Sequence, residues 1–287
     1  MQDNWIDQGN TYDWGENKDS KITPRAKWIV PSILTALLIR VYFMFGWYHP
    51  DLAYIHNIDS GLPSNYYQPL VYHVFKLFHL LMNDSGFWMK APYLFLEAPI
   101  IYILLKLKDE RLLYLWLFNP IVIYSCYIFG QYRMLTALIT WVFLWLLWNN
   151  RKSLAFVAFG LLCSVEIFPW VLFPVVIFTV SKDWLEREWL AIIVLFIFVL
   201  FSGYDIQILS QPIKGIFASH QEWNILVKIL EVFGLLSVWW ISLKSKATVR
   251  LCTVAILIIY ATSPMPVHYL MWVLPFLLFI KKPLSCG

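Results

Sequence analysis

The sequence predicts an all-α polytopic membrane protein with about ten membrane segments. Of its 287 residues, 60% are hydrophobic and 14% are charged, and they include 16 Trp, 16 Tyr and 21 Phe. This apolar share exceeds that of an ordinary soluble domain, and apolar runs of about 15–20 residues recur along the chain. The formal net charge of +4 is too small to indicate a nucleic-acid-binding surface.

Two regions are expected. Residues 1–27 are polar and contain no apolar core of a signal peptide, so we expect a cytoplasmic tail rather than a cleaved leader. Residues 28–287 are expected to form a single membrane domain. The four cysteines lie in apolar spans or near the C-terminus, without a CxxC metal site or a disulfide framework.

The stretch 153–180 determines the number of crossings. As one helix it would be about 42 Å long, more than a hydrocarbon core of about 30 Å, yet two full crossings would be too short. We therefore expect two short helices that break near Glu166 and Pro169 and line an internal cavity, because broken backbone is tolerated only there. The expected segments are 28–47, 87–105, 112–129, 134–149, the pair within 153–180, 188–203, 223–243, 249–263 and 267–280.

The segment 69–83 is too short and too polar to span. It places His73, Lys76 and His79 along one helical strip, which predicts an amphipathic helix lying in the interface of an outer loop.

Basic residues orient the chain. With the N-terminus inside, sixteen of the 22 Lys and Arg fall on the inner side, as the positive-inside rule requires. All six histidines, Asp51, Arg133 and Lys214 then fall on the outer side or at outer helix ends. One interpretation of this asymmetry is a functional site on the outer face of the membrane. The other is that interfacial loops are simply polar. The sixteen are Lys18, Lys21, Arg25, Lys27, Lys106, Lys108, Arg111, Arg151, Lys152, Lys182, Arg187, Lys244, Lys246, Arg250, Lys281 and Lys282.

An ordered series of short motifs extends across residues 40–280. The most specific is FNPIVIYSCYIFGQYR, with Asn119, Pro120, Gly130 and Gln131. This order resembles the GT-C glycosyltransferases that use polyprenyl-phosphate sugars, nearest to the GPI first-mannosyltransferase family and its prokaryotic relatives. The other motif residues are Arg40, Asp51, Tyr54, Gly61, Pro63, Tyr67, Gln68, Pro69, Leu70, Lys90, Glu97, Pro169, Pro174, His268, Tyr269 and Pro275.

The resemblance implies a GT-C-like fold and a hexosyltransferase, most simply a mannosyltransferase, that transfers sugar with inversion. Its donor would be a dolichyl or other polyprenyl phosphate sugar, its acceptor a lipid or glycan, and a small membrane partner subunit is compatible with it. The membrane would be that of the endoplasmic reticulum in a eukaryote and the plasma membrane in a prokaryote, with the site on the lumenal or outer side.

Three positions depart from the family's pattern. The family usually has an acid two residues after the Gly-Gln pair, where this sequence has Arg133. It commonly has a lysine before the Pro-rich break, where this sequence has Glu166. Asp51 has no second acid two residues away, so the DxD metal-binding pattern is absent and dependence on a divalent metal is left open.

The residues suit this chemistry in their own right. Sugar transfer needs a base to take the proton of the acceptor hydroxyl as that hydroxyl attacks the anomeric carbon, and Asp51 is the best-placed carboxylate. The departing lipid phosphate needs cations or hydrogen-bond donors. Arg133, Lys214, His268 and Gln131 are the donor-binding candidates. Tyr54, Tyr67 and Arg40 are expected to position the acceptor or the loop.

Two alternatives remain open. Lys90 and Glu97, seven residues apart, are expected to form a structural pair or to pair with other helices, because intramembrane charges normally find a partner. The whole chain could also be a catalytically silent lipid-binding subunit or a transporter-like protein. A transporter should show internal repeats, and none is detected.

The expected orientation predicts which positions react with a membrane-impermeant thiol reagent. Single cysteines introduced within 48–66 or 205–221 should be labelled from outside, and those within 151–152 or 244–250 should not. Labelling is read on intact cells, with permeabilised cells as the control. Outside labelling at Lys246→Cys would contradict the ten-crossing topology.

Overall fold

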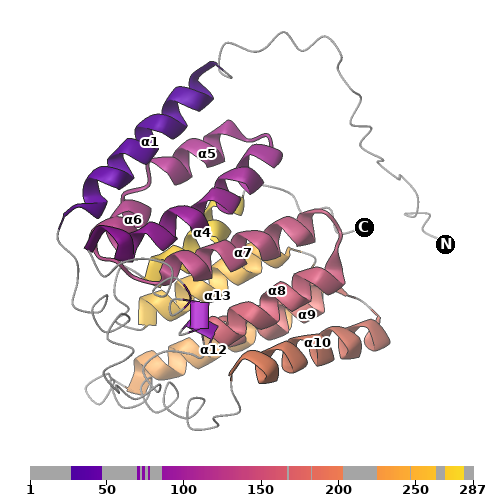
Figure 1. Ribbon diagram of the computed structural model, residues 1–287. Helices are drawn as coiled ribbons and strands as arrows, with labels where there is room; N and C mark the ends of the chain where they lie inside the picture. The colour runs from indigo at the N-terminus through magenta and orange to yellow at the C-terminus, as the bar shows by residue number, and fades with distance from the viewer. Residues whose placement is uncertain are drawn as a thin grey trace.

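The computed structural model describes most of the predicted membrane domain, and all of its regular structure is helical. This confirms the all-α prediction. Figure 1 shows most of the helices lying roughly side by side in a bundle. The described residues are 27–46, 70–71, 73–74, 77, 86–166, 168–181, 183–202, 225–245, 247–262 and 269–280.

The helices follow the expected segments to within a few residues. Most lack a side-chain cap, so their ends are set by the change from apolar to polar sequence and by turns such as that at Asn150, which has a φ of 54°. Their bounds are α1 Ile29–Met44, α4 Gly86–Lys106, α5 Glu110–Leu117, α6 Pro120–Val122, α7 Arg133–Trp148, α8 Lys152–Val165, α9 Phe173–Val180, α10 Trp184–Ser202, α12 Ile225–Ser242, α13 Thr248–Thr262 and α14 Leu270–Phe279.

The expected span 112–129 is divided into three pieces. Helix α5 ends at Leu117, and the side chain of Asn119 accepts a hydrogen bond from the Ile121 amide at 2.9 Å to begin α6. Pro120 occupies the first helical position, where the lack of a backbone N–H costs nothing because that group would have no partner within the helix. The chain then continues as a π-helix, Ile123–Ile128. The sequence motif around Asn119 and Pro120 therefore interrupts the segment.

The break predicted within 153–180 is confirmed. Helix α8 ends at Val165, Glu166 has an extended backbone with φ −137° and ψ 144°, and a 3₁₀ turn, Phe168–Leu172, leads into α9. Pro169 cannot donate to a continued α-helix, so the hydrogen-bonding pattern must change here. Two short helices result instead of one long one.

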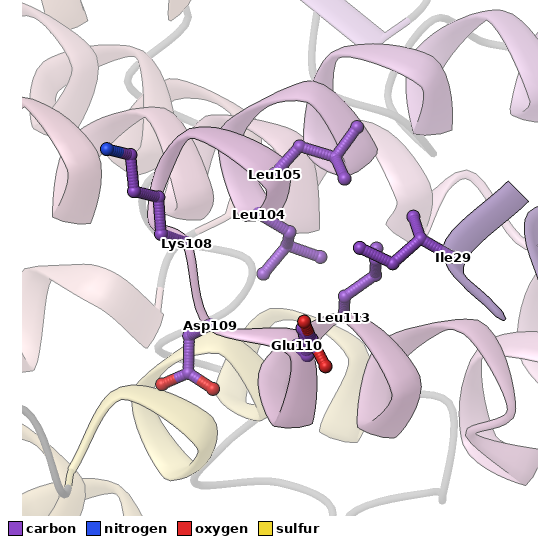
Figure 2. Close-up of a pocket in the computed structure, with 7 residues that line it drawn as sticks. All are labelled: Ile29, Leu104, Leu105, Lys108, Asp109, Glu110 and Leu113. Atoms are coloured by element: carbon purple, nitrogen blue, oxygen red, sulfur yellow. The ribbon is translucent and has the colours of Figure 1, made fainter. Parts of the chain in front are cut away.

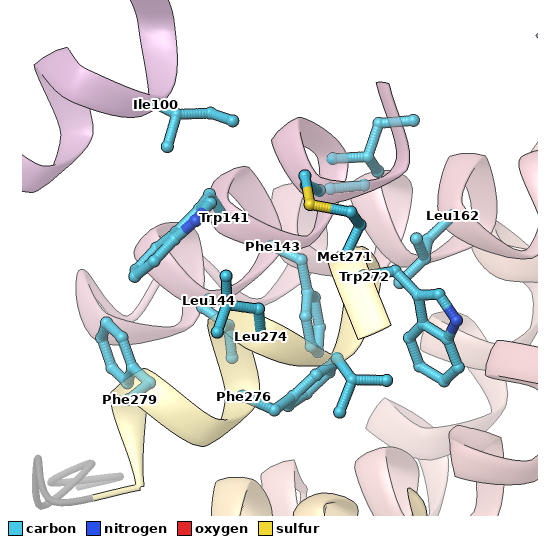
Figure 3. Packing of buried hydrophobic residues seen from close by; sticks show 14 of the residues in the cluster. Ile100, Trp141, Phe143, Leu144, Leu162, Met271, Trp272, Leu274, Phe276 and Phe279 are labelled. Atoms are coloured by element: carbon cyan, nitrogen blue, oxygen red, sulfur yellow. The ribbon is translucent and has the colours of Figure 1, made fainter. Parts of the chain in front are cut away.

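The core forms around α7, which packs on α4, α8 and α14. Figure 3 shows Trp141, Phe143 and Leu144 of α7 facing the α14 side chains Phe276 and Phe279. Trp141 meets Phe279 at 6.1 Å and Phe143 meets Phe276 at 6.4 Å between ring centroids. Edge-on and tilted aromatic contacts of this kind add to the stabilisation from buried apolar area.

Large apolar side chains also face outward, most densely on α1, α10 and α12. Leu38 of α1 is 69% exposed, Phe196 of α10 is 64% exposed and Phe233 of α12 is 65% exposed. In the part of the chain described, one segment, Glu110–Ile128, is long and apolar enough by length and composition to cross a membrane, and several apolar helices of 10–17 residues accompany it. Outward apolar faces of this extent are uncommon on soluble monomers.

Five residues of the predicted interfacial helix 69–83 are described. Leu70, Val71, His73, Val74 and Leu77 are all helical, with Val71 buried and His73 exposed. The helical state of these residues agrees with the expectation, but Leu77, one turn after His73, is 57% exposed, so the exposed side is not purely polar. Its position at a membrane interface stays a prediction.

The close contact between α8 and α10 at Gly160 predicts the effect of a substitution there. A Cβ added at Gly160 of α8 would lie 2.9 Å from the Ile197 Cβ and 3.1 Å from the Val194 carbonyl oxygen of α10. Gly160→Ala should therefore push α10 outward and destabilise the protein by about 1–3 kcal/mol, the usual cost of overpacking. The measurement is the thermal loss of monomer in detergent, followed by size-exclusion chromatography.

The matched control is Gly234→Ala on α12. Its added Cβ would meet only the side chain of Ile258, at 3.2 Å from Cδ1, which can shift. Equal losses in the two variants would show that α8 and α10 are not held by this contact.

Candidate functional site

A buried ion pair joins α1 to α4. Arg40 donates from Nε and Nη2 to the two carboxylate oxygens of Glu97, each at 2.6 Å. Its Nη1 donates to the carbonyl oxygens of Ala36 and Leu117 at 3.0 and 2.9 Å. Glu97 also accepts from the Trp116 indole at 2.9 Å and from the Tyr127 hydroxyl. We call Arg40, Glu97, Trp116 and Tyr127 the Arg40–Glu97 cluster.

Both charges of this cluster are well satisfied. The side chains of Arg40 and Glu97 are each 2% exposed, and a buried ion pair is tolerated when hydrogen bonds use its remaining donors and lone pairs. The expectation that Glu97 pairs with another helix is confirmed. The position of Arg40 inside this network makes it the link between α1, α4 and α5; its predicted role in positioning the acceptor or the loop stays a prediction.

Lys90 lies nearer the start of α4 and is fully buried. Its Nζ donates to the carbonyl oxygens of Tyr127 at 2.8 Å, Ile128 at 3.3 Å and Phe43 at 3.2 Å. Those carbonyl groups belong to the ends of the π-helix and of α1, where helical partners run out. Lys90 therefore ties the start of α4 to the ends of α1 and of the π-helix, again by pairing with other helices.

The turn after the π-helix carries the Gly-Gln motif. Gly130 has a φ of 75° and its carbonyl oxygen accepts from the Tyr93 hydroxyl at 2.6 Å. A glycine adopts this left-handed conformation at little cost. The backbone amide of Gln131 donates to the carbonyl oxygen of Ser125 at 2.9 Å, and Gln131 is buried. Helix α7 begins two residues later, at Arg133.

Arg133 and Glu166 form a second buried ion pair. The Nη1 group of Arg133 meets Oε1 of Glu166, and both side chains are about 95% buried. The Thr136 hydroxyl donates to the same carboxylate at 3.4 Å. The Arg133 guanidinium carbon lies 3.9 Å from the ring centroid of Tyr269 and 4.4 Å from that of Tyr132. We call this the Arg133–Glu166 pair.

The two buried pairs are close to one another. The Cys126 thiol is hydrogen bonded to the backbone of Met134 and interacts electrostatically with Arg40, Glu97 and Arg133. One end of the bundle, where α1 and the π-helix end and α4 and α7 begin, therefore collects several buried polar groups. The sequence assigns this end to the outer side.

The predicted site residues divide into two groups. Arg40, Gln131 and Arg133 are described and buried at this end of the bundle. Five others lie outside the described residues, and their predicted roles stay predictions: Asp51, Tyr54, Tyr67, Lys214 and His268. The sequence did not single out Trp116 or Tyr127 as partners of these charges, because nothing distinguishes them among 16 Trp and 16 Tyr. Tyr269 belongs to a sequence motif, but the motif does not identify it as a partner of Arg133.

A pocket of about 230 Å³ lies at the opposite end of the bundle. Figure 2 shows it between Ile29 of α1, Leu104 and Leu105 of α4, and the turn that carries Lys108 and Asp109. The Asp109 side chain accepts from the Leu112 amide and caps α5. This pocket shares no residue with the two buried pairs.

Comparisons with family models, with curated proteins and with solved structures found no match. Within the described part of the chain, no group of three His, Cys, Asp or Glu side chains is placed to hold a metal ion. The candidate site therefore rests on its own geometry.

The Arg40–Glu97 cluster predicts a strong stability effect. Glu97→Gln should destabilise the protein by about 3–5 kcal/mol, because it leaves the Arg40 guanidinium buried without a counter-charge. Thermal loss of monomer in detergent measures this change. Replacing both partners, Arg40→Met with Glu97→Leu, should recover part of the loss, since no isolated charge remains.

The control is Glu186→Gln, in the pair between Glu186 and Lys152. Those side chains are 35% and 31% exposed, so the loss should be under about 1 kcal/mol. If Glu97→Gln were as stable as Glu186→Gln, the Arg40–Glu97 cluster would not carry the stability assigned to it.

Proposed function

We propose that this chain is a GT-C-like polytopic membrane glycosyltransferase. It moves a sugar, most simply mannose, from a polyprenyl or dolichyl phosphate donor to a lipid-linked or glycan acceptor with inversion. The outward apolar faces of α1, α10 and α12 support a membrane environment, because lipid is the solvent in which such faces need no further cover. The broken α8–α9 pair supports an internal polar site.

The observation that carries this proposal is the buried cation at the start of α7. Arg133 follows the Gly130–Gln131 turn directly and is 3% exposed, within a helix that is otherwise nearly all apolar. An ionisable residue inside a membrane segment is costly and marks a functional site by default. A guanidinium also offers the planar set of donors that suits a phosphate.

The reaction divides the work between two groups of residues. Asp51, in the outer loop expected from the sequence, takes the proton of the acceptor hydroxyl while the acceptor oxygen bonds to the anomeric carbon. The bond from that carbon to the phosphate oxygen breaks, and the lipid phosphate leaves with the electron pair. Arg133, with Lys214, His268 and Gln131, stabilises the charge that grows on the leaving phosphate.

The competing proposal is a catalytically silent subunit of the same fold, which binds lipid and transfers nothing. The discriminating experiment gives purified protein in nanodiscs a labelled dolichyl-phosphate-mannose donor and a lipid acceptor extract. Formation of a mannosylated lipid supports the transferase. Donor binding without transfer, with all lipid acceptors tried, favours the silent subunit.

Asp51→Asn should retain the fold and donor binding while losing most of the transfer activity. The change keeps size and hydrogen bonding but removes the proton acceptor, so the loss should fall on turnover rather than on donor affinity. General-base contributions are typically about 10²–10⁴-fold. Initial rates of mannosyl transfer at saturating donor measure it.

Asp59 lies in the same expected loop outside the motif, so Asp59→Asn serves as the matched control and should stay active. Full activity of Asp51→Asn, or an equal loss in both variants, would remove Asp51 from the mechanism.

A further inference from the structure

The two buried ion pairs differ in how completely their hydrogen bonds are used. In the Arg40–Glu97 cluster the carboxylate accepts from three different side chains, and Arg40 donates to two backbone carbonyl groups besides. Among the described residues, the Glu166 carboxylate has Arg133 and a long contact from Thr136. The first pair is saturated and the second is not.

Arg133 keeps donors that nothing in the described part of the chain accepts. Its Nε is buried without a hydrogen-bond partner there. The same is true of the Trp272 indole N–H, whose side chain is 1% exposed. Leaving such a group unpaired costs about 1–3 kcal/mol. Such unpaired donors suit an anion that offers several acceptor oxygens. A phosphate does so, whereas Glu166 offers the guanidinium one oxygen.

These donors lie on one side of the bundle. Tyr269, whose ring covers the Arg133 guanidinium, precedes Trp272 by three residues on α14, so the two share a helix face. Tyr269 also packs against Phe168 of the 3₁₀ turn at 5.8 Å. The Tyr260 hydroxyl, unpartnered among the described residues, interacts electrostatically with both Arg133 and Tyr269.

The guanidinium has contacts besides Glu166. The rings of Tyr132 and Tyr269, which directly precede α7 and α14, lie 4.4 and 3.9 Å from its carbon and favour the cation where it lies. The carboxylate has fewer contacts: its side-chain partners among the described residues are Arg133 and Thr136, and Glu166 lies at the break after α8. A side chain at such a break can turn away by rotation about its own bonds, and the cation stays behind.

We propose that Glu166 is a displaceable counter-ion for Arg133, whose place the phosphate of a polyprenyl phosphate takes on binding. This inference rests on the proposed function and names the group with which the donor's phosphate competes. The exchange replaces one anion by another, so the buried guanidinium is never left without a counter-charge, which would be costly. Return of Glu166 then competes with the phosphate of the product and favours its release.

The test measures binding of dolichyl phosphate and of dolichol to the full-length protein in phosphatidylcholine nanodiscs. Because the two lipids differ only in the phosphate, the ratio of their affinities measures what the phosphate contributes to binding. Glu166→Gln should raise this ratio by about tenfold or more, the size of one charge-assisted contact, and Arg133→Gln should lower it below the wild-type ratio by a similar factor. Thr136→Val, which removes the second donor to Glu166 and keeps both charges, should raise the ratio by less.

The matched control is Glu186→Gln, in the Lys152–Glu186 pair at the other end of α8, which should bind as wild type does. If Glu166→Gln fails to fold, Thr136→Val still shows whether weakening the hold on Glu166 raises the ratio of the two affinities. An unchanged or lower ratio in whichever of these two variants folds would overturn the proposal that Glu166 is a displaceable counter-ion.

Transfer activity of the wild type is scored separately, which distinguishes the two proposals. Transfer by the wild type together with an unchanged ratio in Glu166→Gln refutes the counter-ion and leaves the enzyme. A raised ratio without any transfer supports the counter-ion and refutes the enzyme. Absence of any preference for dolichyl phosphate in the wild type and all variants overturns both.

Discussion

The ion pair between Arg40 and Glu97 constrains the first half of the molecule. Two opposite charges in apolar surroundings must stay within hydrogen-bonding distance, because either one alone would be strongly destabilising. Through Leu117, Trp116 and Tyr127 the same network reaches α5 and the π-helix. The elements α1, α4, α5 and the π-helix are thus held at fixed distances by polar contacts, where apolar packing alone would allow sliding. Lys90 adds three hydrogen bonds to carbonyl groups at the ends of α1 and the π-helix, which joins the same elements a second time.

The Arg133–Glu166 pair joins the two positions at which the sequence departs from the pattern of the proposed GT-C family. That pattern would place an acid near 133 and a lysine before the Pro-rich break, and this chain has a cation at the first position and an acid at the second. Because the two side chains meet, each charge balances the other and the buried pair is neutral.

The sequence could predict the helices but not their partners. Apolar run length and the positions of prolines predicted segment ends to within a few residues and the break near Glu166, since these depend on local composition and on a missing backbone N–H. Glu97 and Lys90 could be recognised as needing partners, because charge in an apolar run is costly. Which groups supply them depends on how distant segments pack, so Trp116, Tyr127 and the carbonyl group of Phe43 could not be selected. The division of 110–128 was also missed, although Asn119 and Pro120 are its local signal.

The π-helix at Ile123–Ile128 makes the spacing between two motifs part of the structure. Its amides reach back five residues, as from Phe129 to Tyr124, so it accommodates one more residue than an α-helix spanning the same contacts. One residue in an α-helix corresponds to a rotation of about 100°. A chain with a single residue fewer between Asn119 and Gly130 could regain regular α geometry, yet it would turn a different carbonyl group toward Lys90 and a different side chain toward Glu97. Length, more than the identity of any one residue, is what this segment must conserve.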